Sequence, residues 1–240
     1  YQQVQQEVGL GSDGTVGANK QAVKIIGEYA KPYVQGYFSY DSKKSGGLTV
    51  SHLRFGDTPI RSEYLIQEAD YIACHNESFL NSGYDLTEGL KENGIFVLNT
   101  QYGAEQIGGK LPKEMVHALI KKNARLYLID AGKLAHSLGL GNRINMIMQG
   151  AFFHLTGILP QEKALACLKN SIQTAYGKKG AAIVEKNIKA AEYGFRETKL
   201  VPVELLQSTR EERENVQEPE FIENILRPME KAKGDKRCPP

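Results

Sequence analysis

The sequence predicts a three-layer α/β/α sandwich with a mostly parallel sheet, followed by a C-terminal helical block and an extended charged tail. Three observations support this fold class. Short apolar segments typical of buried strands alternate with amphipathic helical segments up to residue 138, which is the order that produces parallel βαβ units. A glycine-rich segment at residues 9–20 leads directly into the first helical pattern. From residue 144 onward the apolar residues recur with helical spacing instead.

The first half of the chain supplies the strands. The helix after the glycine-rich segment is marked by Val23, Ile26 and Ala30 on one face. Further segments are rich in aromatic and β-branched residues and are separated by polar turns. We expect strands at residues 33–41, 48–55, 69–74, 95–99 and 125–130, with helices at 113–122 and 133–138. Residues 2–7, which would form the first strand, are more polar than a buried strand usually is.

The second half of the chain is helical and then charged. Apolar stripes predict three helices, at residues 144–158, 165–175 and 184–195. Pro160 is expected to end the first of them. After Pro202 the chain carries many charges of nearly balanced sign and few apolar residues. We therefore expect a domain at residues 1–206 and a linker or arm at 207–240 that leads to the next domain.

Composition argues against several classes of protein. The formal net charge of the 240 residues is +2, so neither nucleic acid nor a membrane surface is expected as a partner. No apolar run approaches the length of a membrane span. Cys74, Cys167 and Cys238 lie far apart without a CxxC motif, which argues against zinc, iron–sulfur ligation or disulfides and fits a reducing compartment. The chain does not begin with Met, which indicates a fragment of something longer.

The glycine-rich segment is the strongest candidate for a binding site. A glycine loop that opens a helix leaves backbone N–H groups unpaired at the positive end of the helix dipole, where they can bind phosphate. Gly9, Gly11 and Gly14 also satisfy the GxGxxG spacing of dinucleotide sites, a weak pattern that a plain strand-to-helix turn shares. The segment therefore predicts an anion site without deciding the ligand.

Charged residues after the next strand bear on the ligand. Asp41 ends that strand, and Lys43 and Lys44 follow it. In parallel α/β sheets, ligands bind beyond the carboxyl ends of the strands. An acid alone suits the ribose hydroxyls of NAD, whereas lysines beside it favour an extra phosphate, as on a phosphorylated adenosine. A solvated lysine turn without a ligand is the alternative interpretation.

Two later turns carry further candidates. Arg143 lies in a glycine-containing helix entry and can form bidentate contacts with phosphate, while Asn142 beside it is suited to cap the helix. Lys178 and Lys179 lie between two glycines in a basic turn, where solvent exposure alone would explain them. Both turns stay open between a binding role and a structural one.

No complete catalytic centre is expected in this chain. The five histidines are scattered without metal-ligand spacing, and the carboxylates form no paired constellation. Cys74 and His75 are adjacent at a strand end, but neighbouring residues on a strand point to opposite faces, which argues against a Cys–His nucleophile. A thiamine diphosphate signature is also missing, because it needs Gly-Asp-Gly and here Ser12 precedes Asp13.

Six segments, taken in order, form a specific pattern: residues 9–20, 40–47, 51–56, 73–75, 141–149 and 176–180. Together they resemble the pyruvate:ferredoxin (flavodoxin) oxidoreductases, and specifically the third, gamma-type domain of that multidomain enzyme. The resemblance runs from Gly9 to Asp235. Residues 219–228 resemble the start of the following linker domain, and residues 236–240 leave the family pattern.

The resemblance implies a cytoplasmic enzyme of anaerobic metabolism. Such an enzyme decarboxylates pyruvate on thiamine diphosphate, passes electrons through [4Fe-4S] clusters to ferredoxin or flavodoxin, and forms acetyl-coenzyme A. The thiamine and cluster sites would lie in other domains of the same polypeptide, the full-length enzyme would be a homodimer, and this fragment alone would be inactive.

The gamma-type domain is associated with coenzyme A, so the resemblance also implies a ligand for this chain. It assigns coenzyme A contacts to Gly11, Ser12, Asp13, Gly14, Thr15 and Lys43, and further contacts to Arg143, Asn145, Lys179 and Asn187. Two rival classes stay open beside this assignment. One is an NAD(P)-binding dehydrogenase domain, supported by GxGxxG and Asp41, and the other is a scaffold that only positions neighbouring domains.

Overall fold

The computed structural model describes residues 2–10, 15–31, 33–41, 48–61 and 66–214. Three parts of the expected structure therefore lie outside the described residues: the loop residues 11–14, Lys43, and the linker beyond residue 214. Among the described helices, none is both long enough and apolar enough to cross a membrane.

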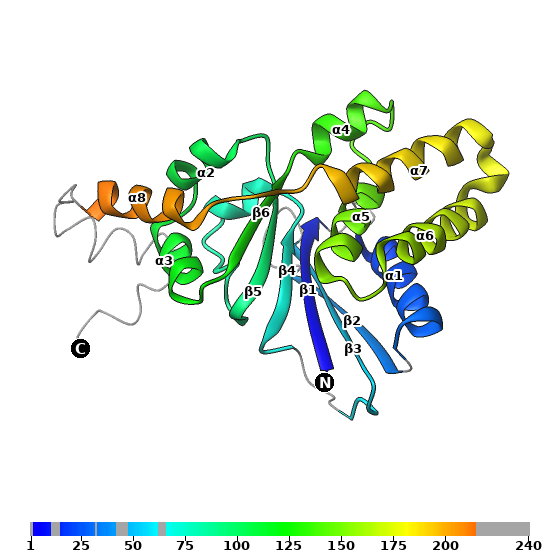
Figure 1. Ribbon diagram of the computed structural model, residues 1–240, viewed down its shortest axis with the longest axis horizontal. Helices are drawn as coiled ribbons and strands as arrows, with labels where there is room; N and C mark the ends of the chain where they lie inside the picture. The colour runs from blue at the N-terminus through cyan, green and yellow to red at the C-terminus, as the bar shows by residue number, and fades with distance from the viewer. Residues whose placement is uncertain (1, 11–14, 32, 42–47, 62–65, 215–240) are drawn as a thin grey trace.

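A single mixed sheet forms the middle layer (Figure 1). Its strands are β1 (Gln2–Leu10), β2 (Tyr33–Asp41), β3 (Leu48–Gly56), β4 (Ala69–Cys74), β5 (Leu90–Asn99), β6 (Arg125–Ile129) and β7 (Lys199–Leu200). Across the described part of the chain the strand order is β2-β3-β1-β4-β5-β6-β7. Strands β1, β4, β5 and β6 are parallel, whereas β2–β3, β3–β1 and β6–β7 pair in antiparallel fashion. Strands β2 and β3 form a hairpin because residues 42–47 are too few for a crossover connection.

Helices cover both faces of the sheet, which confirms the three-layer sandwich. The α-helices are α1 (Thr15–Tyr29), α2 (Ala104–Lys110), α3 (Lys113–Lys121), α4 (Ala131–Ser137), α5 (Asn145–Thr156), α6 (Gln161–Tyr176), α7 (Ala181–Arg196) and α8 (Val203–Glu214), and the 3₁₀ turns are η1 (Glu77–Asn81) and η2 (Gly177–Lys179). A first core lies beneath α1 and α4–α7, and a second beneath η1, α2, α3 and α8. Along β4, Tyr71 and Ala73 enter the first core, while Ile72 and Cys74 enter the second.

The expected elements are confirmed with shifted ends. The polar residues 2–7 belong to β1, the strand expected at 95–99 begins at Leu90, and the first helix of the helical block ends at Thr156 rather than at Pro160. That helix ends early because Gly157 adopts a left-handed backbone conformation with φ of 59°. The Gly157 N–H then donates to the Phe153 carbonyl at 3.3 Å and closes the last turn.

Helix α8 crosses the boundary expected between residues 206 and 207. Leu206 is only 2% exposed and packs in the second core. Thr209 lies against α2 so closely that a Cβ on Gly108 would collide with the Thr209 hydroxyl. The apolar residues at the start of α8 therefore hold it on the second face of the sheet, while residues 215–240 lie outside the described residues.

The chain changes its winding direction between β1 and β4. Helix α1 follows β1 on the first face and leads to β2 at one edge of the sheet. The connections after β4 and β5 lie on the second face and lead toward the other edge. Loops therefore diverge at the carboxyl ends of β1 and β4, which is the place where open α/β sheets bind ligands.

The crossing of α5 and α7 is the tightest packing in the first helical layer. A Cβ on Gly150 of α5 would collide with the Ala191 carbonyl oxygen of α7, and a Cβ on Gly194 would collide with the Ile147 carbonyl oxygen. Only glycine therefore permits this approach of the two backbones. The crossing also positions α5, whose first turn contacts α1 near the carboxyl end of β1, where the ligand is expected.

We expect Gly150→Ala to lower the free energy of unfolding by about 1–3 kcal/mol, because overpacking at the crossing outweighs the higher helix propensity of alanine. Urea denaturation of the chain measures this change. Gly109→Ala is the matched control, since nothing lies within 4 Å of a Cβ at that helical position. The control should be neutral or slightly stabilising, and equal stability of the two variants would contradict the close-crossing interpretation.

Candidate functional site

The candidate site lies where β1 ends and α1 begins. The loop residues Gly11, Ser12, Asp13 and Gly14 fall outside the described residues, so the site is described by the groups that flank them. Thr15 opens α1, and its side chain is buried with 1% exposure. The first turn of a helix carries unpaired N–H groups and the positive end of the dipole. The fold therefore places the start of α1, which an anion site requires, between the carboxyl ends of β1 and β4, where the chain connections turn toward opposite edges of the sheet.

A buried row of three side chains supports this helix start. The Thr15 Oγ1 lies 3.2 Å from Nδ1 of His75, and Nε2 of the same imidazole lies 3.5 Å from a Glu7 carboxylate oxygen. His75 directly follows β4, and its backbone N–H donates to the Val8 carbonyl of β1 at 2.9 Å. His75 and Glu7 are 3% and 4% exposed. Parallel pairing of β1 and β4 thus brings together two polar residues that are far apart in the sequence.

Cys74 does not join this row, as the strand geometry predicted. Its side chain packs in the second core, on the opposite face of the sheet from Thr15 and Glu7. The thiol donates to the Asn76 carbonyl at 3.2 Å. Burial raises the pKa of the Cys74 thiol to about 12, so the thiol stays protonated at neutral pH. A nucleophilic Cys74–His75 pair is therefore excluded.

The start of α5 lies beside the start of α1. The Gln149 side-chain amide, one turn into α5, donates to the Ala18 carbonyl in the first turns of α1. Asn145, expected to contact the ligand, opens α5 and is half-buried. Asn19 of α1 is 1% exposed, and neither atom of its side-chain amide has a hydrogen-bond partner among the described residues. The first turns of the two helices therefore bring several polar side chains together.

The remaining expected site residues are spread more widely. Arg143 is exposed in the turn before α5 and therefore lies near Asn145. Asn187 is buried and donates its amide to the Ile183 carbonyl of its own helix at 2.8 Å. The Lys179 ammonium lies 5.4 Å from the centre of the Tyr176 ring. Figure 1 shows the α6–α7 turn that carries Lys179 at the far end of the helical layer, away from the end of β1.

Sequence reasoning missed four residues of this site: Glu7, His75, Asn19 and Gln149. Glu7 was not singled out, and His75 was considered only as a partner of Cys74, because only the pairing of β1 with β4 brings Glu7 and His75 together. The signal that could have found Asn19 and Gln149 is a polar residue on the apolar stripe of each helix, next to buried positions.

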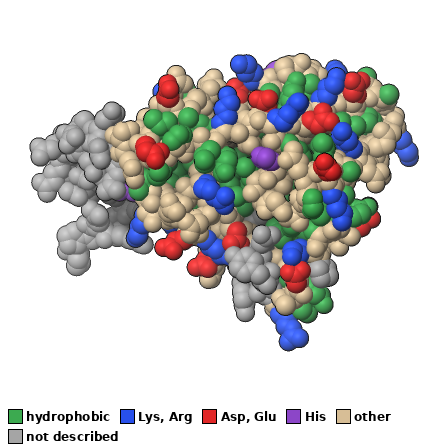
Figure 2. All heavy atoms as spheres, viewed as in Figure 1, with side chains coloured by type: hydrophobic (Ala, Val, Ile, Leu, Met, Phe, Trp, Pro, Cys, Tyr) green, Lys and Arg blue, Asp and Glu red, His purple; other side chains and the backbone are tan. Residues whose placement is uncertain are grey.

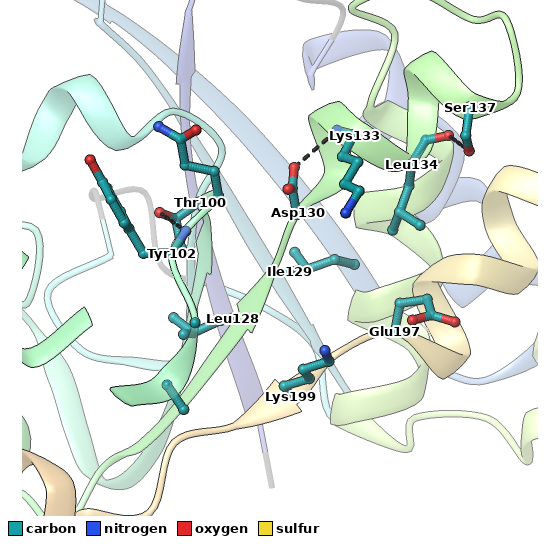
Figure 3. Close-up of a pocket in the computed structure, with 13 residues that line it drawn as sticks. Thr100, Tyr102, Leu128, Ile129, Asp130, Lys133, Leu134, Ser137, Glu197 and Lys199 are labelled. Atoms are coloured by element: carbon teal, nitrogen blue, oxygen red, sulfur yellow. Dashed lines mark hydrogen bonds between the residues drawn. The ribbon is translucent and has the colours of Figure 1, made fainter. Parts of the chain in front are cut away.

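A separate pocket of about 330 Å³ lies beyond the carboxyl ends of β5 and β6 (Figure 3). Asp130, Lys133, Glu197 and Lys199 supply balanced charges at its wall. The Asp130 carboxylate caps α4 by accepting the Lys133 N–H at 2.9 Å. Five of the ten residues that the sequence analysis assigned to the ligand are described, and none of these five lines this pocket: Thr15, Arg143, Asn145, Lys179 and Asn187.

The surface charge on the visible face does not indicate a partner of either charge. Figure 2 shows acidic and basic side chains interspersed over the visible face, without a large patch of one sign. Among the described residues, no group of three or more His, Cys, Asp or Glu side chains is placed to hold a metal ion.

Comparison with known proteins gives a family for this arrangement. Residues 7–197 match the family model described as pyruvate ferredoxin/flavodoxin oxidoreductase. The pyruvate:ferredoxin oxidoreductase of Moorella thermoacetica is 48% identical over 230 residues, which cover 95% of this chain and 20% of that protein. The chain therefore spans about a fifth of the length of the first curated relatives that it matches.

Solved structures show the same fold. The pyruvate oxidoreductase subunit PORC of Thermotoga maritima matches with a TM-score of 0.66 at 22% identity, over 84% of this chain and 99% of that one. A 2-oxoglutarate:ferredoxin oxidoreductase of Magnetococcus marinus, described with 2-oxoglutarate, coenzyme A and succinyl-CoA bound, matches with a TM-score of 0.59 at 16% identity, over 86% of this chain and 31% of that one. At these identities the likeness concerns the fold alone. The family match and the identity to the Moorella protein show that this chain belongs to the pyruvate ferredoxin/flavodoxin oxidoreductase family.

Proposed function

We propose that this chain is the coenzyme A-binding domain of a multidomain pyruvate:ferredoxin or flavodoxin oxidoreductase. The observation that carries the proposal is the start of α1, which follows a glycine-rich loop at the winding reversal between β1 and β4. Open α/β sheets bind phosphate-containing ligands at this place. The Magnetococcus enzyme with a similar fold is described with coenzyme A bound, which makes this the first ligand to test.

The chemistry of coenzyme A fits the groups around this helix start. The ligand carries a diphosphate and a 3′-phosphate on its adenosine. In the proposed site, the N–H groups of residues 11–15 bind phosphate oxygens, as glycine-rich helix starts do. Lys43 and Arg143 supply positive charge, and Asn145 offers a side-chain amide at the start of α5. Lys179 and Asn187 are weaker assignments, because one lies over Tyr176 and the other donates within its own helix.

The chemical step of the parent enzyme is assigned to other parts of the longer protein. A [4Fe-4S] cluster requires four cysteine ligands, whereas this chain has three cysteines in all. Cys74 and Cys167 also belong to opposite cores of the sandwich. We therefore infer that the clusters, and the thiamine diphosphate that activates pyruvate, are held by other domains. The proposed full-length enzyme is a cytoplasmic homodimer that reduces ferredoxin or flavodoxin, and this fragment alone is inactive.

Two other functions make different predictions for ligand binding. An NAD(P)-binding dehydrogenase domain would use the same helix start and Asp41, and would bind NADH or NADPH instead. A scaffold domain would bind none of these ligands. The lysines beside Asp41 favour a ligand with an extra phosphate, which coenzyme A and NADPH share and NADH lacks.

Titration calorimetry of the chain with coenzyme A, dephospho-coenzyme A, NADH and NADPH separates these functions. We expect coenzyme A to bind, and dephospho-coenzyme A to bind more weakly because it lacks the 3′-phosphate that a lysine contacts. Tighter binding of NADPH than of coenzyme A would support the dehydrogenase domain. Absence of binding by all four ligands would support the scaffold.

Substitution of the two basic residues tests the site itself. We expect Lys43→Ala and Arg143→Ala each to weaken coenzyme A binding by about 1–3 kcal/mol, the worth of one charge-assisted hydrogen bond. Lys121→Ala is the matched control, because this exposed lysine lies in α3 on the other face of the sheet. Unchanged affinity in the first two variants, measured by the same calorimetry, would remove these residues from the site.

A further inference from the structure

We propose that His75 is a positioning residue that takes up a proton when an anionic ligand binds at the start of α1, because its imidazole lies between the Thr15 hydroxyl and the buried Glu7 carboxylate. This inference rests on the proposed function for the identity of the ligand, coenzyme A. It goes further in naming a residue outside the glycine-rich loop and in making binding depend on pH.

With Glu7 ionised, the three side chains permit two favourable arrangements of hydrogens. A neutral imidazole carries one N–H. With that proton on Nε2, the N–H faces the Glu7 carboxylate, whose oxygen lies 3.5 Å away without forming a hydrogen bond, and Nδ1 accepts from the Thr15 hydroxyl. A protonated imidazole donates from both nitrogens, so Nδ1 then donates to the Thr15 oxygen. In this second arrangement the hydroxyl hydrogen of Thr15 is directed to another acceptor.

A phosphate at the start of α1 is such an acceptor. Thr15 is the first residue of the helix, where phosphate oxygens receive hydrogen bonds from N–H and hydroxyl groups. A ligand that accepts from the Thr15 hydroxyl therefore stabilises the second arrangement and not the first. Thermodynamic linkage then requires that binding the ligand raises proton occupancy on His75.

The surroundings of His75 allow the protonated form. A buried cation needs an opposite charge, and the Glu7 carboxylate lies 3.5 Å from Nε2. On β5, Asn99 donates to the His75 carbonyl at 2.9 Å and fixes the backbone that carries the ring. His75 lies two residues before η1, and the Glu77 carboxylate at the start of η1 accepts a hydrogen bond from the Thr100 hydroxyl.

Two titratable side chains of β4 near this row, Tyr71 and Cys74, stay neutral at physiological pH. On β4, burial together with the negative charge of Glu7 raises the pKa of Tyr71 well above its usual value. Burial likewise raises the pKa of the Cys74 thiol. Neither group gains or loses a proton between pH 7 and 9. Of the two remaining groups of the row, His75 and Glu7, an imidazole ordinarily titrates closer to this range than a carboxylate, so His75 is the group suited to take up the proton.

Proton uptake can be measured directly. We expect the heat of coenzyme A binding, recorded at pH 8 in buffers of different ionisation enthalpy, to show an uptake of several tenths of a proton per ligand. At this pH the phosphates of coenzyme A are ionised and do not contribute, since the doubly esterified diphosphate is strongly acidic and the second pKa of a phosphate monoester such as the 3′-phosphate is about 6. The association constant should accordingly fall as pH rises from 7.5 to 8.5, because deprotonation of His75 opposes binding.

Variants separate His75 from other proton sources. His75→Asn places a neutral amide that can donate to Thr15 without titrating, so binding should persist while the proton uptake disappears. Thr15→Ser keeps the hydroxyl and should keep the uptake. His117→Asn, in α3 on the other face, is the matched control and should also keep it. Equal uptake in wild type and His75→Asn would overturn the proposal.

A second measurement does not depend on a folded variant. Nitrogen-15 NMR of the wild-type imidazole distinguishes one ring N–H from two, and we expect the His75 signals to shift to the doubly protonated form when coenzyme A or inorganic diphosphate is added. Binding of either probe without that shift overturns this inference alone. Diphosphate binding with the shift, but no binding of coenzyme A, overturns the proposed function alone. Binding of neither probe overturns both.

Discussion

The structure depends on the parallel pairing of β1 with β4. This pairing joins the antiparallel hairpin β2–β3, through β1, to the parallel strands β4, β5 and β6, in a sheet whose two faces carry the two cores of the sandwich. It also sets the register in which Val8 lies beside Cys74, with the His75 N–H bonded to the Val8 carbonyl. The buried contacts of Glu7, His75 and Thr15 follow from that register. The candidate site is therefore a product of strand pairing as much as of its glycine-rich loop.

Much of the fold could be predicted from local patterns. The strands at 69–74 and 33–41 and the helices around Val23 and Ile188 were marked by composition and spacing that act over a few residues. Three features could not be predicted in this way. The antiparallel direction of β3 depends on its neighbours, the early end of α5 depends on the backbone of Gly157, and the packing of α8 depends on contacts with α2 that span about a hundred residues.

The candidate site was predictable to a similar extent. The loop and the start of α1 could be located because glycine spacing and the following helical pattern lie together in the sequence. The first turns of α1 and α5 are brought together by the contact of Gln149 with Ala18, which no single segment of the sequence encodes. The turn with Lys179 was grouped with the start of α1 by its basic composition. The structure places this turn at the far end of the helical layer, away from the end of β1 (Figure 1).

The burial of Cys74 has a consequence for a ligand that ends in a thiol. When an oxidant is present, an exposed cysteine that ionises readily beside such a ligand can be joined to it in a mixed disulfide. Cys74 is separated from the helix start by the sheet and keeps its hydrogen at neutral pH. Burial also raises the pKa of Cys167, in α6. The raised pKa values of both described cysteines therefore disfavour the thiolate form that would react with a thiol carrier.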